Sequence, residues 1–214
     1  DMKKVTFLLF LLSIVLGASC SGGGTKTTNT KPSANAEVKK GVAPIADPEI
    51  AVIEMENSSA YGTIKLELYS NIAPQHVARF KELAKEGYYN GIAFHRINQS
   101  VIQAGDANTK EGGPKTAGKE GDSGKPNVPA EFSDIPYDTG ILGAARLGND
   151  VNSANSQFFI MLKREAAFDN KYSVYGKVIE GMNNVRTIAQ APKAEGTERP
   201  VDPIRIKQIT IVPR

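Results

Sequence analysis

Short runs of alternating apolar and polar residues recur along the chain from about residue 50 onward. The clearest run covers residues 62–69, where Ile64, Leu66 and Leu68 fall on one face. Alternation with a period of two is typical of a β-strand with one buried face. Seven further segments are predicted to be strands: residues 50–55, 94–97, 101–104, 141–145, 158–162, 174–178 and 204–212. The last changes phase near Lys207 and Gln208, which predicts a β-bulge.

Two segments have the spacing of amphipathic helices. Pro74 stands where a first helical turn begins, and an apolar face follows it until Gly87 ends the pattern. A second apolar face begins at Met182 and includes Val185 and Ile188. Eight strands and two helices that do not alternate disfavour a parallel sheet. The pattern therefore predicts a mainly β fold, a closed eight-stranded antiparallel β-barrel capped by two α-helices.

The first twenty residues follow a different pattern. Lys3 and Lys4 precede an apolar run over residues 5–16, and small residues then lead to Cys20. A basic start, a short apolar region and small residues before a cleavage point are typical of a secretory signal peptide. The apolar run is shorter than the roughly 20 residues that a transmembrane helix needs. We therefore expect a signal peptide over residues 1–19.

Cys20 is the only cysteine of the chain. Residues 16–20 resemble the lipobox of bacterial lipoproteins, although Gly17 stands where a branched aliphatic residue is usual. The resemblance implies that Cys20 is acylated, and the alternative is an ordinary secretory signal with an incidental thiol. We favour acylation, which would make this an exported lipoprotein of a bacterial cell envelope, held on a membrane by its lipid alone. The sequence does not indicate which membrane carries the protein, or on which face of that membrane it lies.

The chain then divides into a linker and one domain. Residues 21–48 are mostly Gly, Ser, Thr, Asn, Lys, Ala and Pro, without an aromatic side chain. Such a composition buries too little surface to offset its ordering entropy, so we expect a flexible linker that follows the lipidated cysteine and ends at residue 48. Thirteen of the fifteen Phe and Tyr residues lie between Tyr61 and Tyr175, which indicates a single domain over residues 49–214. A glycine-rich loop is expected over residues 108–125.

Composition excludes several classes of protein. The chain has 214 residues, 40% of them hydrophobic, and a net charge of only +3, which favours a globular fold. Its basic residues form no clustered stripe, so we expect no nucleic-acid partner. One cysteine and two histidines supply little for a zinc site, and we expect neither a metal nor a cofactor. The absence of a G-x-S-x-G motif and of P-loop spacing disfavours hydrolysis and phosphate chemistry.

Polar residues interrupt several of the apolar strands. His95 and Arg96 stand in one, Gln103 stands in the next, and Gln157 precedes the pair Phe158 and Phe159. Adjacent residues of a strand point to opposite faces, so the two phenylalanines must lie in different surroundings. Spacing alone leaves open a groove that binds a peptide or ligand and a purely structural role.

Six motifs resemble, in order, the cyclophilin family of peptidyl-prolyl cis-trans isomerases, and its bacterial branch in particular. They are FHRI at 94–97, QAGD at 103–106, GILGAAR at 140–146, NSQFFI at 155–160, FDNKY at 168–172 and VYGKV at 174–178. The resemblance covers essentially the whole domain. It implies the barrel with two capping helices, a monomer, and isomerisation of X-Pro segments in unfolded or partly folded proteins. The alternative is a scaffold or holdase that binds proline-containing segments with little turnover. A third hypothesis, a surface adhesin, has no specific support in these residues.

The resemblance also implies roles for individual residues. Arg96 becomes the catalytic arginine, Gln103 its support and Phe159 the floor of a proline pocket. The substrate-binding residues that it implies are His95, Val101, Ala145, Arg146, Gln157, Phe168 and Tyr172. The stretch between Arg96 and Gln103 is one residue shorter than usual and lacks the family's phenylalanine. Ala167 stands where many eukaryotic members carry the tryptophan associated with tight cyclosporin binding, so we expect weak cyclosporin binding.

Overall fold

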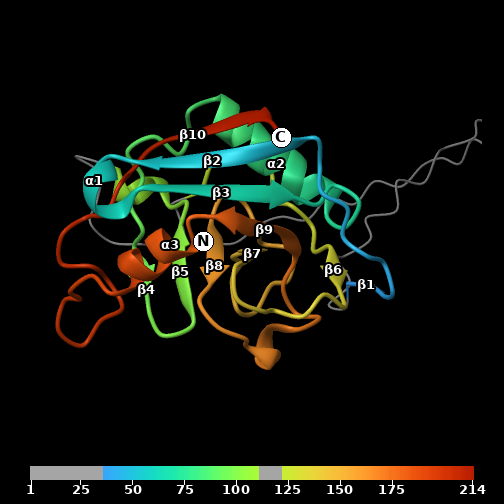
Figure 1. Cartoon of the computed structure of the whole chain (residues 1–214). Helices are drawn as coiled ribbons and strands as arrows, with labels where there is room; N and C mark the ends of the chain where they lie inside the picture. The colour runs from blue at the N-terminus through green and yellow to red at the C-terminus, as the bar shows by residue number, and fades with distance from the viewer. Residues whose placement is uncertain (1–35, 111–121) are drawn as a thin grey trace, which may run out of the picture. The chain divides into compact units, whose positions relative to one another are not determined.

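The computed structural model of the chain describes residues 36–110 and 122–214 (Figure 1). The predicted signal peptide, Cys20 and most of the predicted glycine-rich loop lie outside the described residues. Within the described ranges, no helix has both the length and the apolar character needed to span a bilayer.

The domain is built on one antiparallel sheet with the strand order β10-β2-β3-β9-β7-β8-β5-β4 (Figure 1). All eight strands expected from the alternation are present, and the predicted bulge is the register shift between Ile206 and Gln208. The bounds are β2 (Glu49–Met55), β3 (Thr63–Leu68), β4 (Arg96–Ile97), β5 (Val101–Ala104), β7 (Ile141–Ala144), β8 (Phe158–Met161), β9 (Val174–Glu180) and β10 (Ile206–Pro213).

The curled sheet has no continuous ladder between its edge strands β4 and β10. The segment before β4 instead meets the start of β10, through an isolated bridge between Ala93 and Arg205 and through backbone hydrogen bonds of Gly91 and Ile92 with Ile206. Strand β4 is two residues long, and the backbone N–H of its second residue, Ile97, donates to the carbonyl of Glu198 at 2.7 Å. The mainly β, eight-stranded antiparallel prediction is confirmed, whereas a closed barrel is not, because the sheet is an open half-barrel.

Both predicted helices are present, as α2 (Pro74–Lys85) and α3 (Met182–Ala189). Helix α2 begins at Pro74, and the carboxylate of Glu131 accepts hydrogen bonds from the backbone N–H groups of Gln75 and His76, both at 3.1 Å. Side-chain acceptors at this position satisfy N–H groups that have no partner within the helix. The remaining helical turns are α1 (Ser58–Tyr61), η1 (Ala107–Thr109) and η2 (Ala166–Phe168).

Residues 36–48, which composition places in the linker, lie against the domain. Here β1 (Val38–Lys39) pairs in parallel with β6 (Phe132–Ser133). The buried carboxylate of Asp47 accepts hydrogen bonds from the hydroxyl of Ser70 and the ammonium of Lys81, each at 2.7 Å. The ordered domain therefore begins before residue 49, because backbone pairing and a buried ion pair hold a segment whose composition resembles that of a linker.

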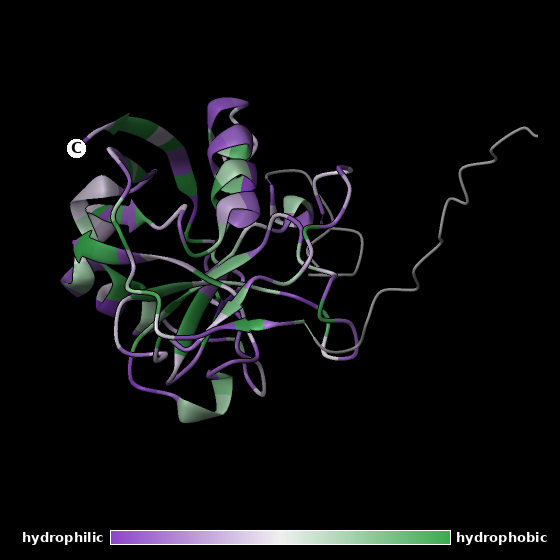
Figure 2. Ribbon diagram, turned by 90° about the vertical axis from the view of Figure 1, so that its right-hand side faces the viewer, coloured by the Kyte–Doolittle hydropathy of each residue, from purple (hydrophilic) through white to green (hydrophobic). Residues whose placement is uncertain are grey.

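The two faces of the central strands supply different cores. Ile102, Phe158 and Ile160 belong to the main core, together with the buried face of α2. Val101, Phe159 and Met161 belong to a smaller cluster on the other face. The prediction that Phe158 and Phe159 lie in different surroundings is confirmed. Figure 2 shows apolar residues along the strands and polar residues over much of the surrounding loops.

Candidate active site

The polar residues singled out from the sequence form a row across neighbouring strands. Arg96 on β4 lies opposite Gln103 on β5, and Gln103 lies opposite Phe159 on β8. Phe159 in turn lies opposite Gly143 on β7. Residues directly opposite each other in an antiparallel pair project from the same face of the sheet. The fold therefore brings together the three residues for which the resemblance implies catalytic roles.

Hydrogen bonds connect the polar end of this row. A terminal nitrogen of Arg96 donates to Gln103 Oε1 at 3.4 Å, and Gln103 Nε2 donates to Gln157 Oε1 at 2.9 Å. The Nε–H of Arg96 donates to the carboxylate of Glu198. The Arg96 side chain is 44% exposed, so its guanidinium is held on two sides and still accessible to a substrate.

A groove of about 970 Å³ opens beside the row. Six of the predicted site residues line it: His95, Arg96, Gln103, Ala145, Arg146 and Gln157. A volume of this size is in the range of ligand-binding clefts. Within the residues that the structure describes, no group of three or more His, Cys, Asp or Glu side chains could hold a metal ion.

The other four predicted site residues, three of them aromatic, form an apolar cluster next to the groove. Phe159 is 3% exposed, and the rings of Phe168 and Tyr172 meet it edge-on, each at 5.7 Å between ring centroids. Val101 is buried in the same cluster. Tyr137, which no sequence pattern singled out, stacks on Phe159 at 5.8 Å. It lies outside every alternating run, so no periodic pattern points to it.

A comparison with protein families decides the identity of the chain. Residues 52–211 match the family described as cyclophilin type peptidyl-prolyl cis-trans isomerase/CLD. The chain belongs to the cyclophilin family. Its enzyme class is therefore that of the peptidyl-prolyl cis-trans isomerases, as the motifs indicated.

Relatives of this cyclophilin occur in bacteria and eukaryotes. A probable peptidyl-prolyl cis-trans isomerase of Brucella suis is 43% identical over 157 residues, which cover 72% of this chain and 78% of the relative. A peptidyl-prolyl cis-trans isomerase of Schizosaccharomyces pombe is 36% identical over 160 residues, covering 73% of this chain and 96% of the relative.

Solved structures agree with this fold. A crystal structure of a Cryptosporidium parvum cyclophilin type isomerase matches with a TM-score of 0.67 at 28% identity, over 78% of this chain and 98% of that one. A crystal structure determined in the presence of the dipeptide Ala-Pro matches with a TM-score of 0.66 at 28% identity, over 77% of this chain and 99% of that one.

His95 of this cyclophilin is buried beside Arg96 and lines the groove. Burial lowers the pKa of the His95 ring to about 4; the charges of Arg199 and Arg96 act in the same direction, against a hydrogen bond with the backbone of Ala93. The ring is therefore neutral at pH 7 and carries no proton that it could give up as an imidazolium acid.

The resemblance implies that the backbone at Ala145 and Arg146 holds the main chain of the substrate. The N–H of Ala145 donates to the carbonyl of Gln157 at 3.0 Å, so the backbone of Ala145 offers a substrate only the Ala145 carbonyl. The guanidinium of Arg146 lies 4.5 Å from the ring centroid of Tyr172 and donates to the carbonyl of Lys171 at 3.0 Å. Arg146 therefore braces Tyr172 and the chain next to it.

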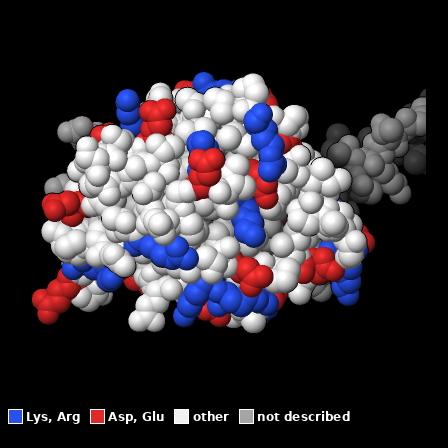
Figure 3. All heavy atoms as spheres, viewed as in Figure 1, with Lys and Arg blue, Asp and Glu red and all other residues white. Residues whose placement is uncertain are grey.

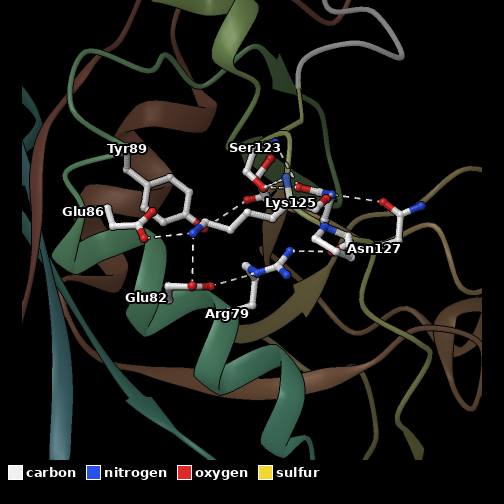
Figure 4. A network of polar contacts seen from close by, with 10 residues as sticks. Arg79, Glu82, Glu86, Tyr89, Ser123, Lys125 and Asn127 are labelled. Carbon is white, nitrogen blue, oxygen red and sulfur yellow. Dashed lines mark hydrogen bonds and ion pairs between the residues drawn. The ribbon is translucent and has the colours of Figure 1, made fainter.

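Residues 122–127 contribute Asp122 and Asn127 to the lining of the groove. This segment is held by contacts with α2 and with Asn155, which precedes β8 (Figure 4). Lys125 pairs with Glu82 at 3.0 Å and with Glu86 at 2.9 Å. Asn155 accepts hydrogen bonds from Ser123 and donates to the carbonyl of Lys125 at 2.8 Å.

On the face in Figure 3, basic and acidic side chains are interspersed among uncharged ones.

Proposed function

We propose that this cyclophilin accelerates X-Pro isomerisation in unfolded or partly folded exported proteins, with Arg96 as the catalytic residue. The observation that carries the proposal is the cross-strand row, in which the accessible guanidinium of Arg96 stands two strands away from the buried ring of Phe159. The same face thus offers a cationic donor beside an aromatic cluster. An X-Pro segment presents an amide nitrogen that is part of an apolar ring, so the donor and the aromatic cluster suit the two parts of this group.

The chemistry needs no bond to be made or broken. Rotation about an X-Pro bond loses amide resonance and crosses a barrier of about 18–20 kcal/mol. In the twisted state the prolyl nitrogen regains a localised lone pair, which accepts a hydrogen bond that the planar amide cannot accept. A donor aimed at this nitrogen binds the transition state more strongly than either ground state, and only such differential binding accelerates the step.

Arg96 suits this role because its guanidinium stays charged and has five N–H donors in one plane. The structure commits the Nε–H to Glu198 and one terminal N–H to Gln103. Other terminal N–H groups remain to meet a prolyl nitrogen. Gln103 therefore acts through Arg96, and its second bond, to Gln157, ties the row to β8.

The remaining predicted residues would hold the substrate. In this proposal Val101, Phe168 and Tyr172 surround the proline ring above Phe159, and the side chain of Gln157 with the carbonyl of Ala145 holds the main chain. Ala167 is exposed and small, which supports the expected weak binding of cyclosporin. The basic and apolar pattern of the first twenty residues supports export and anchoring through acylated Cys20.

A refolding experiment separates catalysis from a holdase role. The substrate is a protein whose slow refolding phase is X-Pro isomerisation, and wild type is compared with Arg96→Ala. Catalysis predicts that wild type shortens the slow phase and that Arg96→Ala does not. A holdase would suppress aggregation equally in both proteins and leave the slow phase unchanged, and that result would refute the proposed activity on protein substrates.

Export and acylation need a separate test on the full chain. Wild type and Cys20→Ala are expressed in a bacterium that processes lipoproteins, and the membrane and soluble fractions are compared. The proposal predicts wild type in the membrane fraction and Cys20→Ala outside it. Equal distribution of the two proteins would contradict acylation at Cys20.

A further inference from the structure

The segment between α3 and β10 forms a braced loop beside the groove. The backbone N–H of Ala194 donates to the carbonyl of Arg199 at 2.9 Å, and that of Val201 donates to the carbonyl of Pro192 at 2.8 Å. An isolated antiparallel bridge joins Lys193 and Pro200. The loop therefore has the cross-connections of a short hairpin, and residues 194 and 197–199 line the groove.

Glu198 of this loop is attached to the strand that carries Arg96. The backbone N–H of Ile97 donates to the carbonyl of Glu198 at 2.7 Å, so the residue is fixed alongside β4. One carboxylate oxygen accepts the Nε–H of Arg96, and the other accepts the side-chain amide of Asn98 at 2.8 Å. Asn98 in turn accepts the backbone N–H groups that follow it in the β4–β5 turn. Both carboxylate oxygens are thus held by groups on or next to β4.

Glu198 is ionised at neutral pH, and its side chain is 47% exposed. Burial would raise the pKa of its carboxyl, but the hydrogen bonds from Arg96 and Asn98, together with the charges of Arg96 and Lys193, hold this pKa below 4.5. The contact of Arg96 with Gln103 is long, at 3.4 Å, whereas Glu198, which accepts the Nε–H of Arg96, is itself held in place by Asn98 and by the N–H of Ile97. Glu198 is therefore the stronger of the two supports that orient the guanidinium.

Since a guanidinium is planar, an acceptor on Nε fixes the direction of the terminal N–H groups as well. We propose that Glu198 is a positioning residue for isomerisation: by accepting the Nε–H of Arg96, its carboxylate turns the terminal N–H groups toward the prolyl nitrogen. This inference rests on the proposed catalytic role of Arg96. It assigns to the α3–β10 loop, which shows no sequence pattern, a direct influence on the rate.

Three substitutions separate the position of the acceptor from its charge. Glu198→Gln keeps an oxygen within reach of Nε but removes the charge, whereas Glu198→Asp keeps the charge on a side chain one methylene shorter. Glu198→Ala removes both. Glu195→Ala is the matched control, because Glu195 is an exposed carboxylate of the same loop that does not line the groove.

The experiment measures kcat and KM of each variant on a short X-Pro peptide, with circular dichroism to confirm the fold. We expect kcat to fall about fivefold in Glu198→Ala and Glu198→Asp, roughly 1 kcal/mol in barrier height, with KM little changed. Glu198→Gln should keep at least half of the wild-type kcat, and Glu195→Ala should match wild type.

Several results would overturn the inference. Wild-type or increased kcat in Glu198→Ala would show that the carboxylate does not support Arg96. A fall in Glu198→Gln as large as that in Glu198→Ala would assign the effect to charge instead of orientation. Arg96→Ala is measured in parallel. If it is inactive while all Glu198 variants match wild type, the positioning role fails alone, whereas wild-type activity of Arg96→Ala refutes the role of Arg96 and, with it, that of Glu198.

Discussion

Gly143 faces the ring of Phe159 across β7 and β8, and a single methyl group there would displace the proposed floor of the proline pocket. A Cβ built on Gly143 lies 2.4 Å from the tip of the Phe159 ring, whereas ordinary contacts lie at 3.4–4 Å. The ring or the strand must therefore move by about 1 Å in Gly143→Ala. Overpacking of this kind typically costs about 1–3 kcal/mol.

The displacement should also reduce catalysis. A misplacement of about 1 Å near a reacting group can lower a rate by as much as about a hundredfold, so we expect kcat/KM of Gly143→Ala to fall at least about tenfold. Urea unfolding and the protease-coupled assay measure the two effects. The matched control is Gly148→Ala, since Gly148 has no atom within 4 Å of its Cβ position.

A second-site change tests the cause of the loss. Adding Phe159→Leu to Gly143→Ala shortens the opposing side chain and should recover part of the stability, while activity stays low because the aromatic floor is gone. Wild-type stability and activity in Gly143→Ala would show that the ring position is not fixed by this contact, and would refute the reasoning.

Three further predictions follow from other sites. The pKa of His95 is lowered from 6.5 to about 4, so on acidification over this range the unfolded chain takes up a proton that the folded chain does not. The free energy of unfolding should therefore fall as the pH drops through this window. Urea unfolding at pH 7 and pH 5 should show a smaller loss of stability in His95→Asn than in wild type. Glu131→Ala leaves two backbone N–H groups of α2 and the ring of His76 without their acceptor, and should cost about 3 kcal/mol in the same assay. Ala167→Trp should lower the midpoint of cyclosporin inhibition, and an unchanged midpoint would contradict the assignment of this position.

Much of the fold is predictable because the strands are half-buried. Alternation over residues 62–69 indicates β3 directly, and Pro74 indicates the start of α2. The closure of the sheet could not be predicted, because it depends on how far the two-residue strand β4 extends and on the segments beside it. Residues 36–48 escaped prediction for a similar reason, since a parallel pair of two residues and a buried ion pair leave no periodic pattern.

The candidate site shows the same division. Family motifs contain the residues on β4, β5 and β8, so Arg96, Gln103 and Phe159 could be named before their register was known. Tyr137 and Glu198 lie in irregular segments, and only the folded chain shows that they contact Phe159 and Arg96. Sequence motifs identify groups on regular strands, whereas the supports of those groups come from loops whose positions are set by tertiary contacts.

The central claim is that the guanidinium of Arg96 performs the acceleration. Its most direct test is kcat/KM for a short X-Pro peptide in a protease-coupled assay with wild type, Arg96→Ala and the control Arg186→Ala, an exposed arginine of α3 outside the groove. The account predicts a loss of at least about a hundredfold in Arg96→Ala, about 2.7 kcal/mol of transition-state stabilisation, and wild-type activity in Arg186→Ala. Equal activity of wild type and Arg96→Ala would contradict it.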